Sequence, residues 1–157
     1  MLLLGKFDHT IDPKGRLAIP AEVRSVLDPA THGEALIAAP GANETLWLWP
    51  ERTFERFAEA LGGSLLGDED LLAFERHLFS QASRCTLDAA GRVRIPDRLL
   101  RGFGIESAVV IAGVRDHLEL MTPARWETEQ SSLQATHADV WRRARAALSD
   151  AGRRNSS

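Results

Sequence analysis

The amino-acid sequence predicts an α+β protein in which one β-rich unit is present twice. Residues 10–20 recur as residues 86–96, with six of eleven positions identical and two further exchanges between aliphatic side chains. A second similarity relates residues 46–54 to residues 118–126, at an offset of 72 positions where the first has 76. Apolar residues between the copies have helical spacing. The chain is therefore expected to contain two tandem repeats, with additional helices between and after them.

A turn opens the recurring motif of each repeat. Asp12 is followed by Gly15, and Asp88 is followed by Gly91 in the same way. Asp can accept hydrogen bonds from the backbone N–H groups of a turn, and Gly can adopt the positive φ that such a turn requires. We expect these four residues to be structural, with each Asp also able to pair with the Arg four positions later.

The segments after each turn predict a strand, a short helix and two further strands. Residues 16–19 and 92–95 alternate in the period-two manner of a half-buried strand. A proline then ends each strand and suits the first turn of a helix, expected at residues 21–27 and 97–103. Two more apolar runs in each repeat predict the remaining strands.

These patterns divide the chain into five segments. They are a first repeat at residues 5–54, a connecting helical segment at residues 55–80 that Gly62 and Gly63 interrupt, a second repeat at residues 81–126, a C-terminal helix at residues 127–148 and a disordered tail at residues 149–157. The helices are expected from their apolar spacing, and the tail from its position at the chain terminus.

The distribution of charge along the chain is more informative than its total. The net charge is −3, but ten acidic and only three basic residues lie within residues 25–79. Residues 1–24 and 80–110, which hold the two turns, are mildly basic. Because the field at one face decides binding, the acidic total does not exclude a nucleic-acid partner.

The composition predicts a globular protein of the cytoplasm. The apolar fraction is 44% and the charged fraction is 26%, which are ordinary values for a folded domain. Cys85 is the single cysteine and is expected to be a buried, small hydrophobic residue in a reducing compartment. The apolar run at residues 1–4 is too short for a signal peptide or a membrane span, so no membrane partner is expected.

The paired Asp-x-x-Gly-Arg elements resemble those of the MraZ family, which has the AbrB-like swapped-hairpin DNA-binding fold. The resemblance covers residues 5–126. It implies two tandem AbrB-like swapped-hairpin β-barrel repeats that form an intramolecular pseudo-dimer. It also implies a cytoplasmic, nucleoid-associated transcriptional regulator that represses its own division and cell-wall operon. Such a protein binds directly repeated promoter boxes in double-stranded DNA as a homo-oligomeric ring.

Lys14 and Arg16 of the first turn are the primary candidates for contact with DNA. A guanidinium offers a rigid fork to guanine edges or phosphate, and an ammonium suits phosphate as a point charge. Arg92 and Arg94 are secondary candidates, because Ala90 stands where the first copy has Lys14. An alternative stays open, in which these charged residues are only solvated or pair with the neighbouring Asp.

No catalytic residue, metal site or cofactor is predicted. The sequence lacks the P-loop, dinucleotide-binding, zinc-protease and nucleophile-elbow motifs, and its five histidines lack metal-ligand spacing. The acidic residues 68–70 are typical of the start of a helix. Trp47 and Trp49 could stack on bases, but a position in the core or at a subunit interface is favoured.

Two other classes of function stay open from the sequence. A protein–protein interaction module of the same fold, without DNA binding, is supported by the acidic middle segment. A small hydrolase or metal enzyme would need a spatial cluster of His and Asp side chains. An enzyme would show a deep polar pocket with perturbed titratable groups, whereas a DNA-binding protein would show the basic turns on one exposed face.

Overall fold

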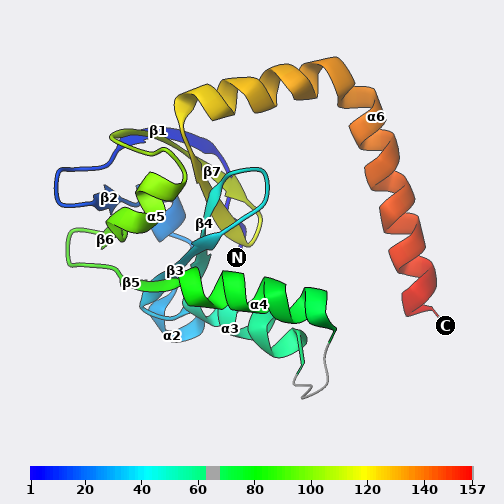
Figure 1. The fold of residues 1–157 in the computed structure, drawn as a ribbon, viewed down its shortest axis with the longest axis horizontal. Coiled ribbons are helices and arrows are strands. Elements are labelled where there is room, and N and C mark those ends of the chain that lie inside the picture. Colours follow the sequence, from blue (N-terminus) through cyan, green and yellow to red (C-terminus); the bar gives the residue numbers. More distant parts are fainter. Residues whose placement is uncertain (63–67, 157) are drawn as a thin grey trace. The chain divides into compact units, whose positions relative to one another are not determined.

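The computed structural model describes residues 1–62 and 68–156. It divides into two compact units, Met1–Pro123 and Ala124–Ser157. In chain order, the elements of the first unit (Figure 1) are β1 (Lys6–Thr10), β2 (Arg16–Ala18), α1 (Ala21–Arg24), α2 (Pro29–His32), β3 (Ala35–Pro40), β4 (Leu46–Pro50), α3 (Glu51–Ala60), α4 (Glu69–Gln81), β5 (Ser83–Thr86), β6 (Arg92–Arg94), α5 (Asp97–Gly102), β7 (Ala108–Val114) and β8 (His117–Met121). The second unit consists of helix α6 (Pro123–Asn155), whose first residue lies at the boundary.

The same order of elements recurs in the two halves of the first unit. β1, β2, α1, β3 and β4 correspond to β5, β6, α5, β7 and β8, and the predicted α+β fold is confirmed. Helix α1 ends at Arg24 and not at Leu27 as expected. The first repeat also has the extra helix α2, which Pro29 begins and the side chain of Asp28 caps.

The larger sheet joins the two repeats by exchanging their strands. β1 pairs with β7, so that Thr10 lies opposite Ala108. β5 pairs with β3 in the equivalent register, so that Thr86 lies opposite Ala35. In the centre of the sheet, β4 pairs with β8. The two repeats are therefore related by an approximate two-fold axis through the middle of the sheet.

The strands of the described residues do not close into a barrel. The larger sheet is antiparallel with the order β1-β7-β8-β4-β3-β5, and β2 and β6 form a separate two-stranded sheet. The closed barrel expected from the resemblance is therefore not seen in residues 1–62 and 68–156. The reason is that β2 and β6, which follow the two edge strands in the chain, pair with each other and do not bridge the edges.

One hydrophobic core connects the two sheets. Leu17 of β2 and Val93 of β6 are fully buried. The larger sheet contributes Leu46, Leu118 and Leu120 to the same cluster. Burial of such a side chain stabilises the fold by about 1.5–3 kcal/mol relative to exposure. This shared core fixes the position of the small sheet and of the two turns that flank it.

Helices α3 and α4 cover a second, smaller hydrophobic cluster. Phe54 of α3 and Leu78 of α4 are buried there with Ala39 of β3, and Trp49 packs against them. At the start of α4, the side chain of Asp68 accepts a hydrogen bond from a backbone N–H group, as expected for the acidic start of a helix. Trp49 is therefore partly buried and packs against the core within the chain.

Two helices, α3 and α4, form the helical segment between the repeats. α3 begins at Glu51, inside the range expected for the first repeat, and α4 continues to Gln81. Gly62 has a positive φ of 71° just after α3, as a glycine at the end of a helix commonly does. Gly63, the second residue of the expected break, lies outside the described residues.

Helix α6 is longer than the C-terminal helix expected from the sequence. It begins at Pro123 and continues to Asn155, so residues 149–155, expected to be a disordered tail, are helical. Proline suits the first position of a helix because its missing N–H would have no partner there. Among the described residues, no helix is both long enough and apolar enough to cross a membrane.

Candidate nucleic-acid interface

The side chain of Asp12 organises the first turn. Its Oδ1 atom accepts hydrogen bonds from the backbone N–H groups of Lys14 and Arg16, at 2.9 and 2.8 Å. Its Oδ2 atom accepts a third hydrogen bond from Nε of Arg16 at 2.6 Å. Gly15 has a φ of +78° and donates its N–H to the carbonyl oxygen of Asp12. The local sequence therefore fixes both the turn and the start of the Arg16 side chain.

The second turn repeats this geometry almost atom for atom. Oδ1 of Asp88 accepts from the N–H groups of Ala90 and Arg92, both at 2.9 Å. Oδ2 accepts from Nε of Arg92 at 3.0 Å, and Gly91 has a φ of +75°. The shared residues Asp, Gly and Arg are thus the ones that the turn itself uses.

These hydrogen bonds favour the ionised form of each aspartate. The backbone N–H of Arg16 lowers the pKa of Asp12 below its ordinary value of 3.8, and the Arg16 side chain lowers it further. The corresponding hydrogen bonds from Arg92 lower the pKa of Asp88. Both carboxylates are therefore charged at neutral pH, and each holds its arginine in a fixed direction.

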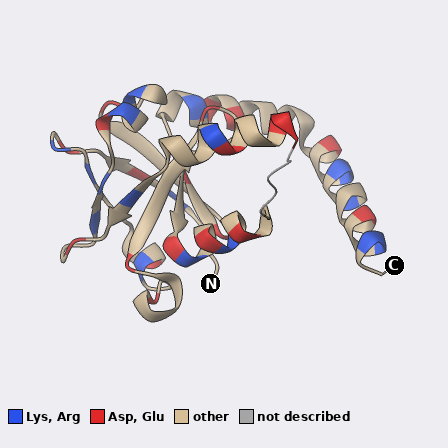
Figure 2. Ribbon diagram, turned by 60° about the horizontal axis from the view of Figure 1, so that its bottom comes forward, with Lys and Arg blue, Asp and Glu red and all other residues tan. Residues whose placement is uncertain are grey.

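The small sheet presents its arginines on one face. In the register of β2 and β6, Arg16 lies opposite Arg94, and Ala18 lies opposite Arg92. Residues that lie opposite each other, or two apart on one strand, project from the same side of a sheet. The other side carries the buried Leu17–Val93 pair. Figure 2 shows basic residues along these strands and on the adjoining turn.

We call Lys14, Arg16, Arg92 and Arg94 the basic face. Lys14 is exposed at the tip of the first turn, and Arg94 is exposed on β6. The side chains of Arg16 and Arg92 are 33% and 36% exposed. Their ion pairs with Asp use Nε, which leaves the fork of terminal nitrogens for an external acceptor. Arginines that face each other across a sheet repel, so an anion bound here would be stabilised by both.

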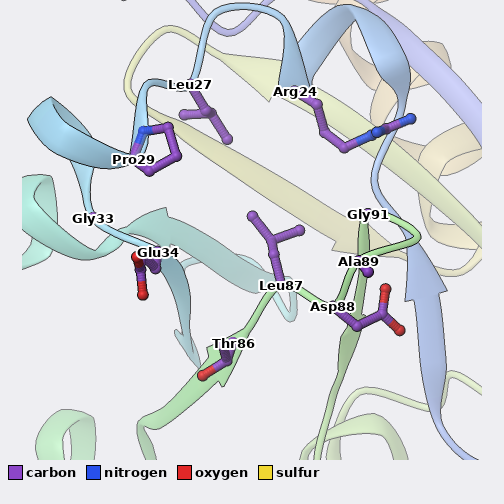
Figure 3. Close-up of a pocket in the computed structure, with 10 residues that line it drawn as sticks. All are labelled: Arg24, Leu27, Pro29, Gly33, Glu34, Thr86, Leu87, Asp88, Ala89 and Gly91. Carbon is purple, nitrogen blue, oxygen red and sulfur yellow. The ribbon is translucent and has the colours of Figure 1, made fainter.

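A cavity of about 340 Å³ lies beside the second turn. Asp88 and Gly91 line it from the second repeat, and Arg24 and Glu34 line it from the first (Figure 3). No motif in the sequence distinguishes Arg24, because the contact of its side chain with the second turn arises only when one repeat packs on the other.

Trp47 lies on the larger sheet and makes contacts within the chain. Its ring stacks on the ring of His117, with 4.0 Å between the centroids. Its Nε1 atom donates a hydrogen bond to Oγ1 of Thr45 at 2.7 Å. These contacts support a structural role for Trp47 over base stacking.

His117 is buried between two carboxylates. Its ring nitrogens lie 2.8 Å from Oδ1 of Asp116 and 2.9 Å from Oε2 of Glu119. Burial alone would lower the pKa of His117, but the hydrogen bonds with Glu119 and Asp116 outweigh it, so the pKa is raised above its ordinary value of 6.5. The cluster stacks against Trp47 and Trp49 and stabilises the sheet at β8.

The remaining candidates for chemistry are the metal-ligating side chains and Cys85. Within the described residues, no group of three or more His, Cys, Asp or Glu side chains is arranged to hold a metal ion. Cys85 is buried in β5, and its burial raises the pKa of the thiol. A thiol in this environment is a poor nucleophile.

Comparison with protein families matches the chain to a family described as "MraZ protein, putative antitoxin-like". The match has two parts, residues 2–66 and residues 78–145. Each part contains one of the two turns, and together they span both repeats. The duplication seen in the sequence and in the order of the elements is therefore a property of the family as well.

Several curated bacterial proteins resemble the chain over nearly their whole length. A protein of Symbiobacterium thermophilum is 38% identical over 123 residues, which are 78% of this chain and 86% of that protein. A protein of Roseiflexus sp. (strain RS-1) is 35% identical over 134 residues, which are 85% of this chain and 90% of that protein. A protein of Heliobacterium modesticaldum is 32% identical over 139 residues, which are 88% of this chain and 94% of that protein. All three are named "Transcriptional regulator MraZ".

Proposed function

The chain belongs to the MraZ family, and on this premise we propose that it is a sequence-specific DNA-binding regulator that represses transcription of its own division and cell-wall operon. The observation that carries the proposal is the basic face, which combines two turns of nearly identical geometry on one small sheet. Lys14 and Arg16 make the primary contacts with double-stranded DNA, and Arg92 and Arg94 add to them. Repression follows because bound protein occludes the promoter.

The basic face suits DNA because its cations are oriented before binding. Each Asp holds Nε of its arginine, so less side-chain entropy is lost when the guanidinium meets a phosphate or a guanine edge. The arrangement also fits a swapped-hairpin pseudo-dimer. The N–H of Ile19 donates to the carbonyl oxygen of Gly91 at 3.0 Å, and the N–H of Ile95 donates to that of Gly15 at 2.9 Å. Each turn is thus supported by the other repeat.

We further propose that the protein acts as a homo-oligomeric ring on directly repeated promoter boxes. Helix α4 supports this, because its large apolar side chains are 38–51% exposed; they are Leu71, Leu72, Phe74 and Phe79. A cavity of about 480 Å³ beside Phe74 is lined also by Trp47, Trp49 and Phe57. Exposed apolar surface of this kind marks interaction sites. A ring would present several basic faces to spaced boxes, and its affinity for DNA would rise because binding at one box increases the effective concentration of the ring at the next. This higher affinity for DNA would hold the protein at the nucleoid.

The test is a fluorescence anisotropy titration against duplex from the region upstream of its own gene. Duplexes with one box and with several boxes are compared over a range of salt. We expect affinity that rises with the number of boxes and falls steeply with salt. Arg16→Ala should weaken binding by about 10- to 100-fold, whereas Arg56→Ala, an exposed arginine on α3, should not. A DNA affinity that Arg16→Ala leaves unchanged would refute the assignment of the basic face.

A second candidate function is a protein–protein interaction module of the same fold that does not bind DNA. The apolar surface of α4 and its cavity favour it, since they suit a protein partner as well as a second copy. Wild-type protein that forms a defined complex with another protein but shows no salt-dependent affinity for any upstream duplex would establish this alternative.

A further inference from the structure

The structure points to an additional DNA contact that the two motifs do not contain. We propose that Arg24, from the first repeat, supplies the second turn with the phosphate contact that Lys14 gives to the first. This inference rests on the proposed DNA-binding function. Three observations carry it: the missing cation of the second turn, the position of the Arg24 side chain, and the residue that occupies the equivalent position beside the first turn.

The second turn lacks a cation at its tip. Ala90 occupies the position of Lys14, although both residues have their N–H bonded to the Asp of their turn. The two turn backbones are therefore alike, but the second turn has only the arginine at its base and Arg94 on the following strand. A second phosphate contact at this turn must come from elsewhere in the chain.

The Arg24 side chain lies directly against the second turn. A Cβ atom placed on Gly91 would lie 2.7 Å from Cδ and from Nε of Arg24. Nε of Arg24 donates a hydrogen bond to the carbonyl oxygen of Ile19 at 3.0 Å, and the N–H of Ile19 donates to Gly91 at 3.0 Å. Ile19 thus ties the arginine of one repeat to the turn of the other. Figure 3 shows the side chain extending over Gly91.

Within the described residues, the guanidinium of Arg24 is not neutralised by an ion pair. Arg24 is exposed, and its one hydrogen bond in the described part of the chain uses Nε. Asp88, which lines the same cavity, is paired with Arg92 and not with Arg24. The terminal nitrogens of Arg24 are therefore open to an external acceptor, and their planar fork matches two phosphate oxygens.

The first turn has no equivalent arginine. With the offset of 76 positions that relates the motifs, Arg24 corresponds to Leu100, which is 4% exposed and belongs to the core. A Cβ atom on Gly15 would meet only the carbonyl oxygen of Ile95, at 3.1 Å. Each turn therefore has one extra cation, Lys14 from within the first motif and Arg24 from across the repeat boundary.

The test compares four full-length variants in the anisotropy titration with upstream duplex. These are Arg24→Ala, Ala90→Lys, the double variant Arg24→Ala/Ala90→Lys, and Arg101→Ala as a matched control. Arg101 lies at the end of α5, next to the position equivalent to Arg24, and is paired with Asp97. Thermal unfolding of each variant is measured alongside, because loss of the Arg24–Ile19 hydrogen bond could also loosen the turn.

We expect Arg24→Ala to lower DNA affinity by about 5- to 20-fold and to reduce the slope of log K against log salt by about 1 per chain. Ala90→Lys should restore both quantities in the double variant, because it places a cation on the same turn from within the motif. Arg101→Ala should leave both within two-fold of wild type. An unchanged salt slope in Arg24→Ala, or a double variant that is not rescued, would show that Arg24 only supports the fold. Wild-type protein without DNA affinity would overturn the proposed function itself.

Discussion

The two turns of this protein have the same backbone and different surroundings. Asp12 and Asp88 accept the same three hydrogen bonds, with distances that differ by no more than 0.4 Å. The side chains at the tips of the two turns differ, since the first tip carries Lys14 and the second carries Ala90. The residues that the copies share are those that make the turn, and the residues that differ set its charge. A duplicated binding element can therefore keep its shape while its two copies take unequal shares of the contact.

The largest effect is expected from breaking the core that both turns share. Leu17→Ala removes a fully buried side chain at the centre of the small sheet and should destabilise the protein by about 2–5 kcal/mol. Val93→Ala, at the equivalent position, should cost less because fewer atoms are removed. The free energy of unfolding of both variants is measured by urea denaturation. A loss below 1 kcal/mol for Leu17→Ala would mean that the small sheet is not held by this core.

Substitution of the two turn glycines should reveal a smaller difference in stability between the two turns. Gly15→Ala and Gly91→Ala both force a left-handed backbone conformation on an L-residue, which costs about 1–2 kcal/mol. The Cβ of Gly91→Ala would lie 2.7 Å from the flexible end of the Arg24 side chain, which must then move and lose its hydrogen bond to Ile19, whereas the Cβ of Gly15→Ala would lie 3.1 Å from a backbone carbonyl oxygen. Gly91→Ala should therefore cost more by no more than the value of that hydrogen bond. The comparison is made by urea unfolding. Adding Arg24→Ala to Gly91→Ala should narrow the difference, and a difference that stays the same would contradict the steric explanation.

A second difference between the repeats should appear as a pH dependence. At the offset of 72 positions, His117 corresponds to Thr45, and the pKa of His117 is raised by its two carboxylate neighbours despite burial. Because the folded pKa is raised, the stabilisation is complete below pH 6.5 and is lost as the pH rises through the raised pKa. The thermal midpoint should decline over this interval, and His117→Gln should remove the decline. His137→Gln, on the exposed face of α6, is the control that should leave it intact.

The smallest effect is expected from the turn aspartates at acidic pH. The folded pKa values of Asp12 and Asp88 are lowered, so their contribution is present above the ordinary value of 3.8 and is lost as the pH falls through the lowered values. Both groups are near the surface, which keeps the change small. Asp12→Asn and Asp88→Asn should each reduce the loss of unfolding free energy at acidic pH. The two reductions should be similar, because the two turns have the same hydrogen bonds. Unequal changes would show that the two hydrogen-bond networks differ in strength.

Local features of the sequence were enough to predict the turns, the strands that follow them and the duplication. Asp–Gly spacing and period-two alternation depend on neighbouring residues only, so they can be read directly. The exchange of β1 and β5 between repeats, the open sheet and the position of Arg24 depend on contacts between distant segments, which periodicity does not encode. The ends of α1 and α6 were misplaced for a related reason, because helix ends depend on caps and packing more than on apolar spacing.

The exchange of strands also has a consequence for how the chain is made. The first repeat cannot complete its sheet alone, since β1 finds its partner in β7 and β3 needs β5. On the ribosome, residues near the N-terminus must wait until about a hundred more have been synthesised before their partners exist, and until then they present unpaired strand edges. The complete sheet therefore cannot form before most of the second repeat exists, and a transcript truncated between the repeats would yield a chain in which β1 and β3 lack these partners.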